Sequence, residues 1–186
     1  MGVDPTARWV FVQIKNNKTA ASARDFLKDL QQTCPIKITK ILTDNGKEFT
    51  DRLFSSRESS GNHLFDQLCQ QLGIEHRLTK PRTPQTNGMV ERFNGRIADV
   101  LKTHHFDSAQ DLEQTLMHYA TLYNHQLPQS ALKGKTPIQT MKQWYQSHPE
   151  LFHKPPDNQQ GWDIFYIPND YWVALLNYLG CIWYQR

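Results

Sequence analysis

Cysteine pairs are missing from this sequence, and with them the usual marks of a zinc site or a disulfide framework. The three cysteines, Cys34, Cys69 and Cys181, stand far apart, and none belongs to a Cys-x-x-Cys pair. The eight histidines likewise form no His-x-x-x-His or mixed Cys/His array. This spacing excludes an ordinary zinc-binding module. An odd cysteine count without a secretion signal predicts a chain that stays reduced in the cytoplasm.

Long apolar runs are missing as well. Only 38% of the 186 residues are hydrophobic, and the aromatic stretch at 171–184 is interrupted by polar residues. It falls short of the roughly 18 apolar residues that a membrane-spanning helix needs, so no membrane partner is expected. With five tryptophans, the chain has enough apolar bulk for one moderate core. We therefore expect one main soluble domain.

An excess of positive charge is small overall but concentrated in one stretch. The formal net charge is only +3, yet the residues from Glu75 to Lys102 include six Lys or Arg against three acids. A local positive field of this kind suits a phosphodiester backbone. The other interpretation is an ordinary solvated face.

The first third of the chain has the pattern of a βαβ unit. Residues 9–14 alternate as a strand, and Thr19 opens a helix whose apolar residues recur at helical spacing over 20–32. Residues 36–43 form the next strand. Two strands joined in this way by a helix are expected to be parallel.

The rest of the chain is mainly helical. A helix over 64–72 stops at Gly73 and leads into a short strand at 74–78. Further helices are predicted from about residue 88, over 109–123 and over 137–147. The fold class is therefore α/β.

One acidic residue, Asp44, stands at the end of a predicted strand. It follows the run at 36–43 and precedes Asn45-Gly46, a turn signal that ends the strand. Taken alone, an Asp in this place is usually a turn former.

A second acidic residue, Glu91, falls in the first turns of a predicted helix. Thr86 or Asn87 offers the side-chain oxygen that caps this helix. Alone, a Glu there serves the helix dipole. Together with Asp44, however, it gives a pair of carboxylates that can hold a hard divalent cation and leave room for water and phosphate.

The surroundings of these two acids resemble the second and third acidic motifs of DDE transposases and retroviral integrases. Among these proteins, the bacterial insertion-sequence transposases with an integrase-type core are the most similar. Residues 43–49 read Thr-Asp-Asn-Gly-Lys-Glu-Phe, and residues 83–94 read Thr-Pro-Gln-Thr-Asn-Gly-Met-Val-Glu-Arg-Phe-Asn. Residues 123–137, with Tyr-Asn, Ser-Ala-Leu and Thr-Pro, resemble the family's C-terminal segment. The resemblance covers about residues 4–157 and implies an RNase H-like fold, a mixed sheet flanked by helices.

The resemblance also implies a function, which is DNA integration and transposition by two-metal phosphodiester cleavage and strand transfer. Asp44 and Glu91 would be catalytic residues and ligands of two Mg²⁺ or Mn²⁺ ions about 4 Å apart. The expected partner is DNA, at transposon ends and target, together with self-association. DNA contacts are implied for residues around the two motifs: Lys47, Lys80, Arg82, Gln85, Asn87, Arg92 and Arg96. For Asn87, helix capping is an equally good explanation.

Two features depart from the family pattern. Many relatives carry a basic residue seven positions after the Glu, where this chain has Ala98. Arg92 or Arg96 is the candidate to replace it. Residues 55–62 look like a loop insertion that lengthens the segment between the two acids.

The first of the family's three acids has no clear counterpart. In the family's fold three antiparallel strands precede the first helix, and the first acid sits on the first of them, in the middle of the sheet. Here only one strand-sized run precedes the helix, and Asp4-Pro5-Thr6 resembles the turn between the second and third strands. We therefore expect an N-terminally truncated fold whose first strand is missing. The backbone groups of the strand before Asp44 then need another partner, or the fold is marginal.

The expected organisation is an incomplete integrase core at 1–125, a C-terminal family segment at 126–157 and an aromatic tail at 158–186. The tail could be helical over 171–184, and it either has no selected function or serves self-association. The alternative to an active enzyme is an inactive remnant with at most nonspecific DNA binding. A weaker third hypothesis is a host nuclease of the same fold.

Overall fold

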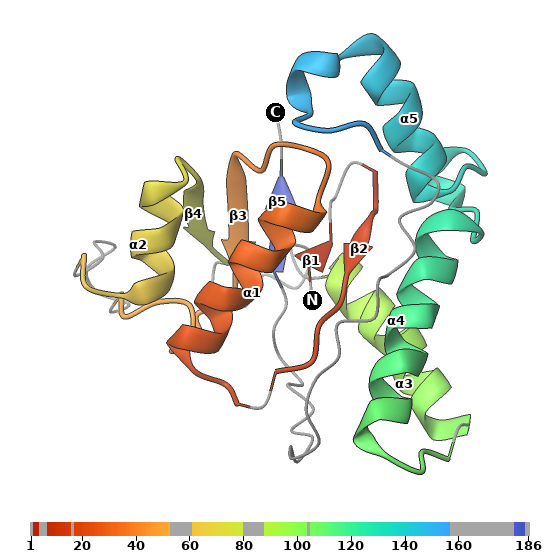
Figure 1. The fold of residues 1–186 in the computed structure, drawn as a ribbon, viewed down its shortest axis with the longest axis horizontal. Coiled ribbons are helices and arrows are strands. Elements are labelled where there is room, and N and C mark those ends of the chain that lie inside the picture. The colour runs from red at the N-terminus through yellow and green to blue at the C-terminus, as the bar shows by residue number, and fades with distance from the viewer. Residues whose placement is uncertain are drawn as a thin grey trace.

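The computed structural model describes residues 2–3, 7–15, 17–52, 61–79, 88–103, 105–156 and 181–184. They form one five-stranded sheet with helices packed around it (Figure 1). The strands are β1 (Gly2–Val3), β2 (Val10–Phe11), β3 (Lys40–Thr43), β4 (Glu75–Leu78) and β5 (Cys181–Tyr184). The helices are α1 (Ala20–Thr33), α2 (Leu64–Gln71), α3 (Gly88–Thr103), α4 (Ala109–His125) and α5 (Pro137–Ser147), with short 3-10 turns η2 (Ser130–Leu132) and η3 (Pro149–Leu151).

Three helices begin at the predicted caps, and α2 ends at the predicted glycine, whereas Thr86 and Asn87, the predicted caps of α3, lie outside the described residues. Thr19, Ser108 and Thr136 each accept a hydrogen bond from the backbone N–H three residues later, and Thr136 completes a capping box with Gln139. Gly73 follows α2 with a φ of 67°, the left-handed conformation that ends a helix. The predicted helices are confirmed, with small shifts at their ends.

The sheet has the order β2-β1-β5-β3-β4. β1 and β2 are antiparallel, and β3 and β4 are parallel. β5 joins these two pairs, running parallel to β1 and antiparallel to β3. These directions make β2 and β3 parallel to each other, as predicted for the βαβ unit, although β1 and β5 lie between them.

The centre of the sheet is closed by β5, which comes from the aromatic tail. Ile41 of β3 pairs with Trp183, and Leu42 pairs with Ile182. The prediction that the strand before Asp44 needs another partner is therefore confirmed. The interpretation of 171–184 as helical is wrong for Cys181–Tyr184, because the unpaired side of β3 takes them up as a strand. Residues 157–180 lie outside the described residues.

Two strand predictions need correction. β2 is shorter than the predicted run 9–14, and β1 also precedes α1, so two strands stand where the sequence indicated one. A two-residue strand shows no alternation that a sequence could reveal. The run 36–43 is a regular strand only over β3, and Ile36 pairs with Phe152 in an isolated bridge. Asp4 lies outside the described residues, between the antiparallel strands β1 and β2.

Two hydrophobic clusters lie on opposite faces of the sheet. Ile41 and Phe11 belong to the larger cluster, which side chains of α1, α2 and α5 complete. Their neighbours Leu42 and Val10 contact the smaller cluster, built with residues of α3 and α4. Because successive side chains of a strand point to opposite faces, this alternation places α1 and α2 on one face and α3 and α4 on the other (Figure 1). Within the described part of the chain, no helix is long and apolar enough to cross a membrane.

The edge strand β2 is held by one buried side chain of α4. Asn124 is only 3% exposed. Its Oδ1 accepts a hydrogen bond from the Val10 N–H at 2.9 Å, and its Nδ2 donates to the Val10 carbonyl at 2.8 Å. A single amide thus satisfies both backbone groups, as a neighbouring strand would. This contact gives the Tyr-Asn pair at 123–124 a structural role.

Candidate active site

Asp44 follows β3 directly, at the carboxyl end of the strand, as predicted. Its Oδ1 accepts a hydrogen bond from the Gly46 N–H at 2.9 Å, which closes a tight turn on the side chain. The Gly46 carbonyl then accepts hydrogen bonds from the N–H groups of Phe49 and Thr50. Asn45 ties the turn to the end of β4, because its Nδ2 donates to the Thr79 carbonyl at 3.1 Å. The turn that the sequence predicted at Asn45-Gly46 is therefore rigidly held.

Glu48 supports this turn, a role that sequence reasoning missed. Its side chain is only 4% exposed, and its Oε1 lies 3.0 Å from Nζ of Lys18, just before α1. A Cβ atom placed on Gly46 would lie 2.5 Å from the same oxygen. A side chain at position 46 would therefore displace the Glu48 carboxylate, which lies directly over the glycine. The signal was present in the Gly-x-Glu spacing, but only the fold shows what it does.

The Asp44 carboxylate is half-buried, and its surroundings disfavour the ionised form. Burial is the largest influence and raises the pKa of Asp44 above its ordinary value. The Gly46 hydrogen bond and the Lys18 charge lower this pKa, but the Glu48 charge raises it further, and the net shift is upward. Among the described residues, Gly46 makes the one hydrogen bond to the carboxylate. A divalent cation would relieve the cost of ionisation, and carboxylate oxygens are the ligands that Mg²⁺ and Mn²⁺ prefer. Asp44 therefore fits the role of a metal ligand.

Glu91, the second predicted acid, lies in the first turn of α3. Its side chain is outside the described part of the structure, so the distance between the two carboxylates stays a prediction. Phe93, two residues later, is buried and contacts the rings of Tyr119 and Tyr123, which fixes this end of α3 against α4. Within the described ranges, no group of three His, Cys, Asp or Glu side chains could hold a metal ion.

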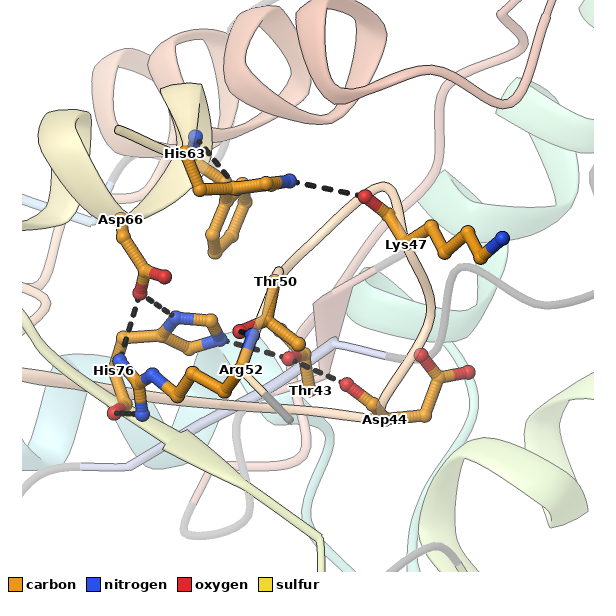
Figure 2. Close-up of polar contacts among 9 residues, drawn as sticks. Thr43, Asp44, Lys47, Thr50, Arg52, His63, Asp66 and His76 are labelled. Atoms are coloured by element: carbon orange, nitrogen blue, oxygen red, sulfur yellow. Dashed lines mark hydrogen bonds and ion pairs between the residues drawn. The ribbon is translucent and has the colours of Figure 1, made fainter. Parts of the chain in front are cut away.

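Two of the predicted DNA-contacting residues have described side chains. Lys47 is exposed at the tip of the Asp44 turn, and its carbonyl accepts a hydrogen bond from His63 Nε2 at 3.0 Å (Figure 2). Arg96 is exposed on α3, with its guanidinium carbon 5.8 Å from the centre of the Tyr123 ring. The other predicted contacts lie outside the described residues or have undescribed side chains: Lys80, Arg82, Gln85, Asn87 and Arg92.

Comparison with known proteins decides the family. Two family models, both of the integrase core domain, match residues 2–84 and 72–137. The chain belongs to the integrase core domain family. A protein of insertion element IS476 from Xanthomonas euvesicatoria is 34% identical over 100 residues, which is 53% of this integrase core and 26% of that protein. The retrovirus-related Pol polyprotein from transposon TNT 1-94 of Nicotiana tabacum is 29% identical over 103 residues, or 54% of this chain and 7% of that one. The chain spans between 7% and 36% of the length of four curated relatives that it matches.

The structural comparison agrees with this assignment. The catalytic core domain of BIV integrase matches with a TM-score of 0.55 at 22% identity, over 77% of this integrase core and 83% of that domain. The predicted RNase H-like fold is confirmed. The motifs around Asp44 and Glu91 fall inside the two matched ranges, so the resemblance stated from the sequence is confirmed as well.

Proposed function

We propose that this integrase core is the catalytic segment of a DDE transposase that acts on DNA. The reaction is metal-dependent phosphodiester cleavage followed by strand transfer. The observation that carries the proposal is the half-buried carboxylate of Asp44 at the carboxyl end of β3, held by Gly46 and supported by Glu48. Glu91, in the first turn of α3, is proposed as its partner.

In this proposal Asp44 and Glu91 hold Mg²⁺ or Mn²⁺. Bound ions of this kind activate an attacking oxygen and stabilise the leaving oxygen in an in-line displacement. The contribution of the chain is to hold the Asp44 oxygens in place. The turn does this through the Gly46 N–H, while Lys18 keeps Glu48 folded over Gly46. A side chain that is already held in place loses little conformational entropy when it binds the metal, which suits a site with few ligands.

DNA phosphates are the proposed partners of the basic residues near Asp44 and Glu91. Lys47 is exposed three residues beyond Asp44, and Arg96 is exposed on the helix that carries Glu91. Lys80, Arg82, Gln85, Asn87 and Arg92 complete the proposed set. Contacts to phosphates carry no sequence information and release counterions. Binding by this chain is therefore expected to be weak, unspecific and steeply dependent on salt.

One observation favours a second candidate function, DNA binding without chemistry. The family's first acid sits on the central strand of the sheet, and here that position is taken by β5, whose residues are Cys-Ile-Trp-Tyr. A two-metal displacement would lack its shared ligand. We propose that the 186-residue chain on its own binds a cation and DNA but does not cut. Self-association, as the family resemblance implies, belongs to the same proposal.

The test combines a Mn²⁺ titration followed by electron paramagnetic resonance with a nicking assay on supercoiled DNA. Asp44→Asn and Glu91→Gln are each expected to lose Mn²⁺ binding. Asp99→Asn is the matched control, because Asp99 is 79% exposed on the same helix as Glu91. Mn²⁺ binding that is equal in wild type and Asp44→Asn would overturn the metal site. Nicking by the wild type that disappears in both Asp44→Asn and Asp4→Asn would overturn the inactive assignment and make Asp4 the first acid.

A further inference from the structure

A chain of buried hydrogen bonds runs from α2 through β4 to the end of β3 (Figure 2). Asp66 Oδ1 lies 2.6 Å from His76 Nδ1, and His76 Nε2 lies 2.8 Å from Thr43 Oγ1. Thr43 Oγ1 donates in turn to the carbonyl of Asp44 at 2.9 Å. The side chains of Asp66 and His76 are 7% and 2% exposed, and Thr43 is fully buried. A continuous polar connection therefore ends on the backbone of the proposed metal ligand.

Two neighbours hold this connection in place. Arg52 donates to Asp66 Oδ1 at 2.8 Å and to the His76 carbonyl at 3.3 Å. The Phe65 ring meets the His76 ring edge-on, with centroids 5.0 Å apart. Burial raises the pKa of Asp66, but the His76 hydrogen bond and the charges of His76 and Arg52 outweigh it, so the net shift is downward. Asp66 is therefore a carboxylate that only accepts hydrogen bonds.

The Thr43 hydroxyl joins the two halves of this connection. It donates to the Asp44 carbonyl, and it lies within hydrogen-bond distance of His76 Nε2. The other ring nitrogen of His76 is held by the Asp66 carboxylate. A single buried hydroxyl therefore links the His76 ring to the backbone of Asp44.

We propose that Thr43, His76 and Asp66 are positioning residues for Asp44. They hold the carbonyl side of Asp44, while Gly46 holds the carboxylate. With both ends of the residue fixed, its carboxylate is presented to the cation in one orientation. The inference rests on the proposed function in one respect only, namely that Asp44 is the residue that meets the metal.

The test uses Thr43→Val, which replaces the hydroxyl by a methyl group of similar size, and measures two properties of the full chain. In the metal-free chain, hydrogen exchange of the Gly46 N–H reports how firmly the Asp44 carboxylate is held, and we expect it to become about tenfold faster. The Mn²⁺ affinity is expected to fall about tenfold, the lower end of the losses seen when a residue supporting a metal ligand is removed. Thr43→Ser keeps the hydroxyl and is expected to restore both properties. His76→Phe, which removes the hydrogen-bond partner of the Thr43 hydroxyl but keeps a ring beside Phe65, provides a second route to the same loss.

Thr136→Val is the matched control for a purely structural role. Thr136 is 5% exposed, and its Oγ1 accepts from the Gln139 N–H at 3.3 Å, so this variant also removes a buried, hydrogen-bonded hydroxyl, but at the start of α5. It is expected to lower stability without changing the Gly46 exchange rate. An exchange rate of Gly46 in Thr43→Val that equals the rate in Thr136→Val would overturn the inference, whatever the metal result. Equal Mn²⁺ affinity in wild type and Asp44→Asn would instead overturn the proposed function, and the Gly46 exchange rate would still decide the positioning role.

Discussion

Substitution of Asn124 tests how the second half of the chain holds the sheet. Its amide is the partner of both the N–H and the carbonyl of Val10, at 2.9 and 2.8 Å. Asn124→Ala leaves both groups unpaired in a buried place, at a cost of about 1–3 kcal/mol each. We expect the free energy of unfolding to fall by about 2–6 kcal/mol, which corresponds to a drop in Tm of roughly 5–20 °C for a domain of this size. Urea unfolding followed by circular dichroism measures the first quantity, and a thermal scan measures the second.

Two further variants sharpen this prediction. Asn124→Asp keeps an acceptor for the Val10 N–H but sets a carboxylate against the Val10 carbonyl. Its stability deficit relative to wild type should shrink on acidification, because a protonated Asp can donate to that carbonyl. Gln114→Ala removes an exposed amide from the same helix and should change stability by less than about 0.5 kcal/mol. A loss in Asn124→Ala no larger than in Gln114→Ala would refute the reasoning.

Three other perturbations follow from the same contacts. Asp44→Asn should raise stability at pH 7, because the pKa of this carboxyl is raised on folding. The stability that its protonation contributes is fully present below the ordinary pKa of 3.8 and is lost as pH rises through the higher folded-state pKa. The free energies of unfolding of variant and wild type should therefore converge at more acid pH, and divergence there would contradict the sign. Gly46→Ala should lower the free energy of unfolding by about 1–3 kcal/mol, because the added Cβ would displace the Glu48 carboxylate. Gly95→Ala has open space around its Cβ and should raise the free energy of unfolding by about 0.5–1 kcal/mol. Removing residues 181–186 should leave β1 and β3 without their shared partner strand. The truncated chain should be less stable and should self-associate through the exposed strand edges. An unchanged Tm and an unchanged solution mass would show that β5 is dispensable.

The parts of the fold that could be predicted are those with local causes. The caps at Thr19, Ser108 and Thr136 bond to atoms three residues away, so the sequence alone indicates them. The turn after Asp44 is equally local, since Gly46 donates to a side chain two residues before it.

The parts that could not be predicted depend on contacts between distant residues. β5 joins a sheet whose other strands all lie before residue 79, and nothing in four residues of sequence marks that destination. Glu48 is close to Asp44 in sequence, but its position over Gly46 depends on the ion pair with Lys18, which lies just before α1. The contact of His76 with both Asp66 and Thr43 depends on packing α2 against the sheet. Buried polar groups of this kind have no periodic signature, so only the fold brings them together.

The central claim, that Asp44 and Glu91 form one metal site, is tested most directly by a crystal structure of the chain soaked in Mn²⁺. The anomalous signal of manganese locates the ion without reference to the protein. We predict a peak bonded to a carboxylate oxygen of Asp44 and to one of Glu91, at about 2.1 Å from each. No peak at Asp44, together with a separation of the two carboxylates of more than about 10 Å, would contradict the claim, because that distance exceeds any two-metal arrangement.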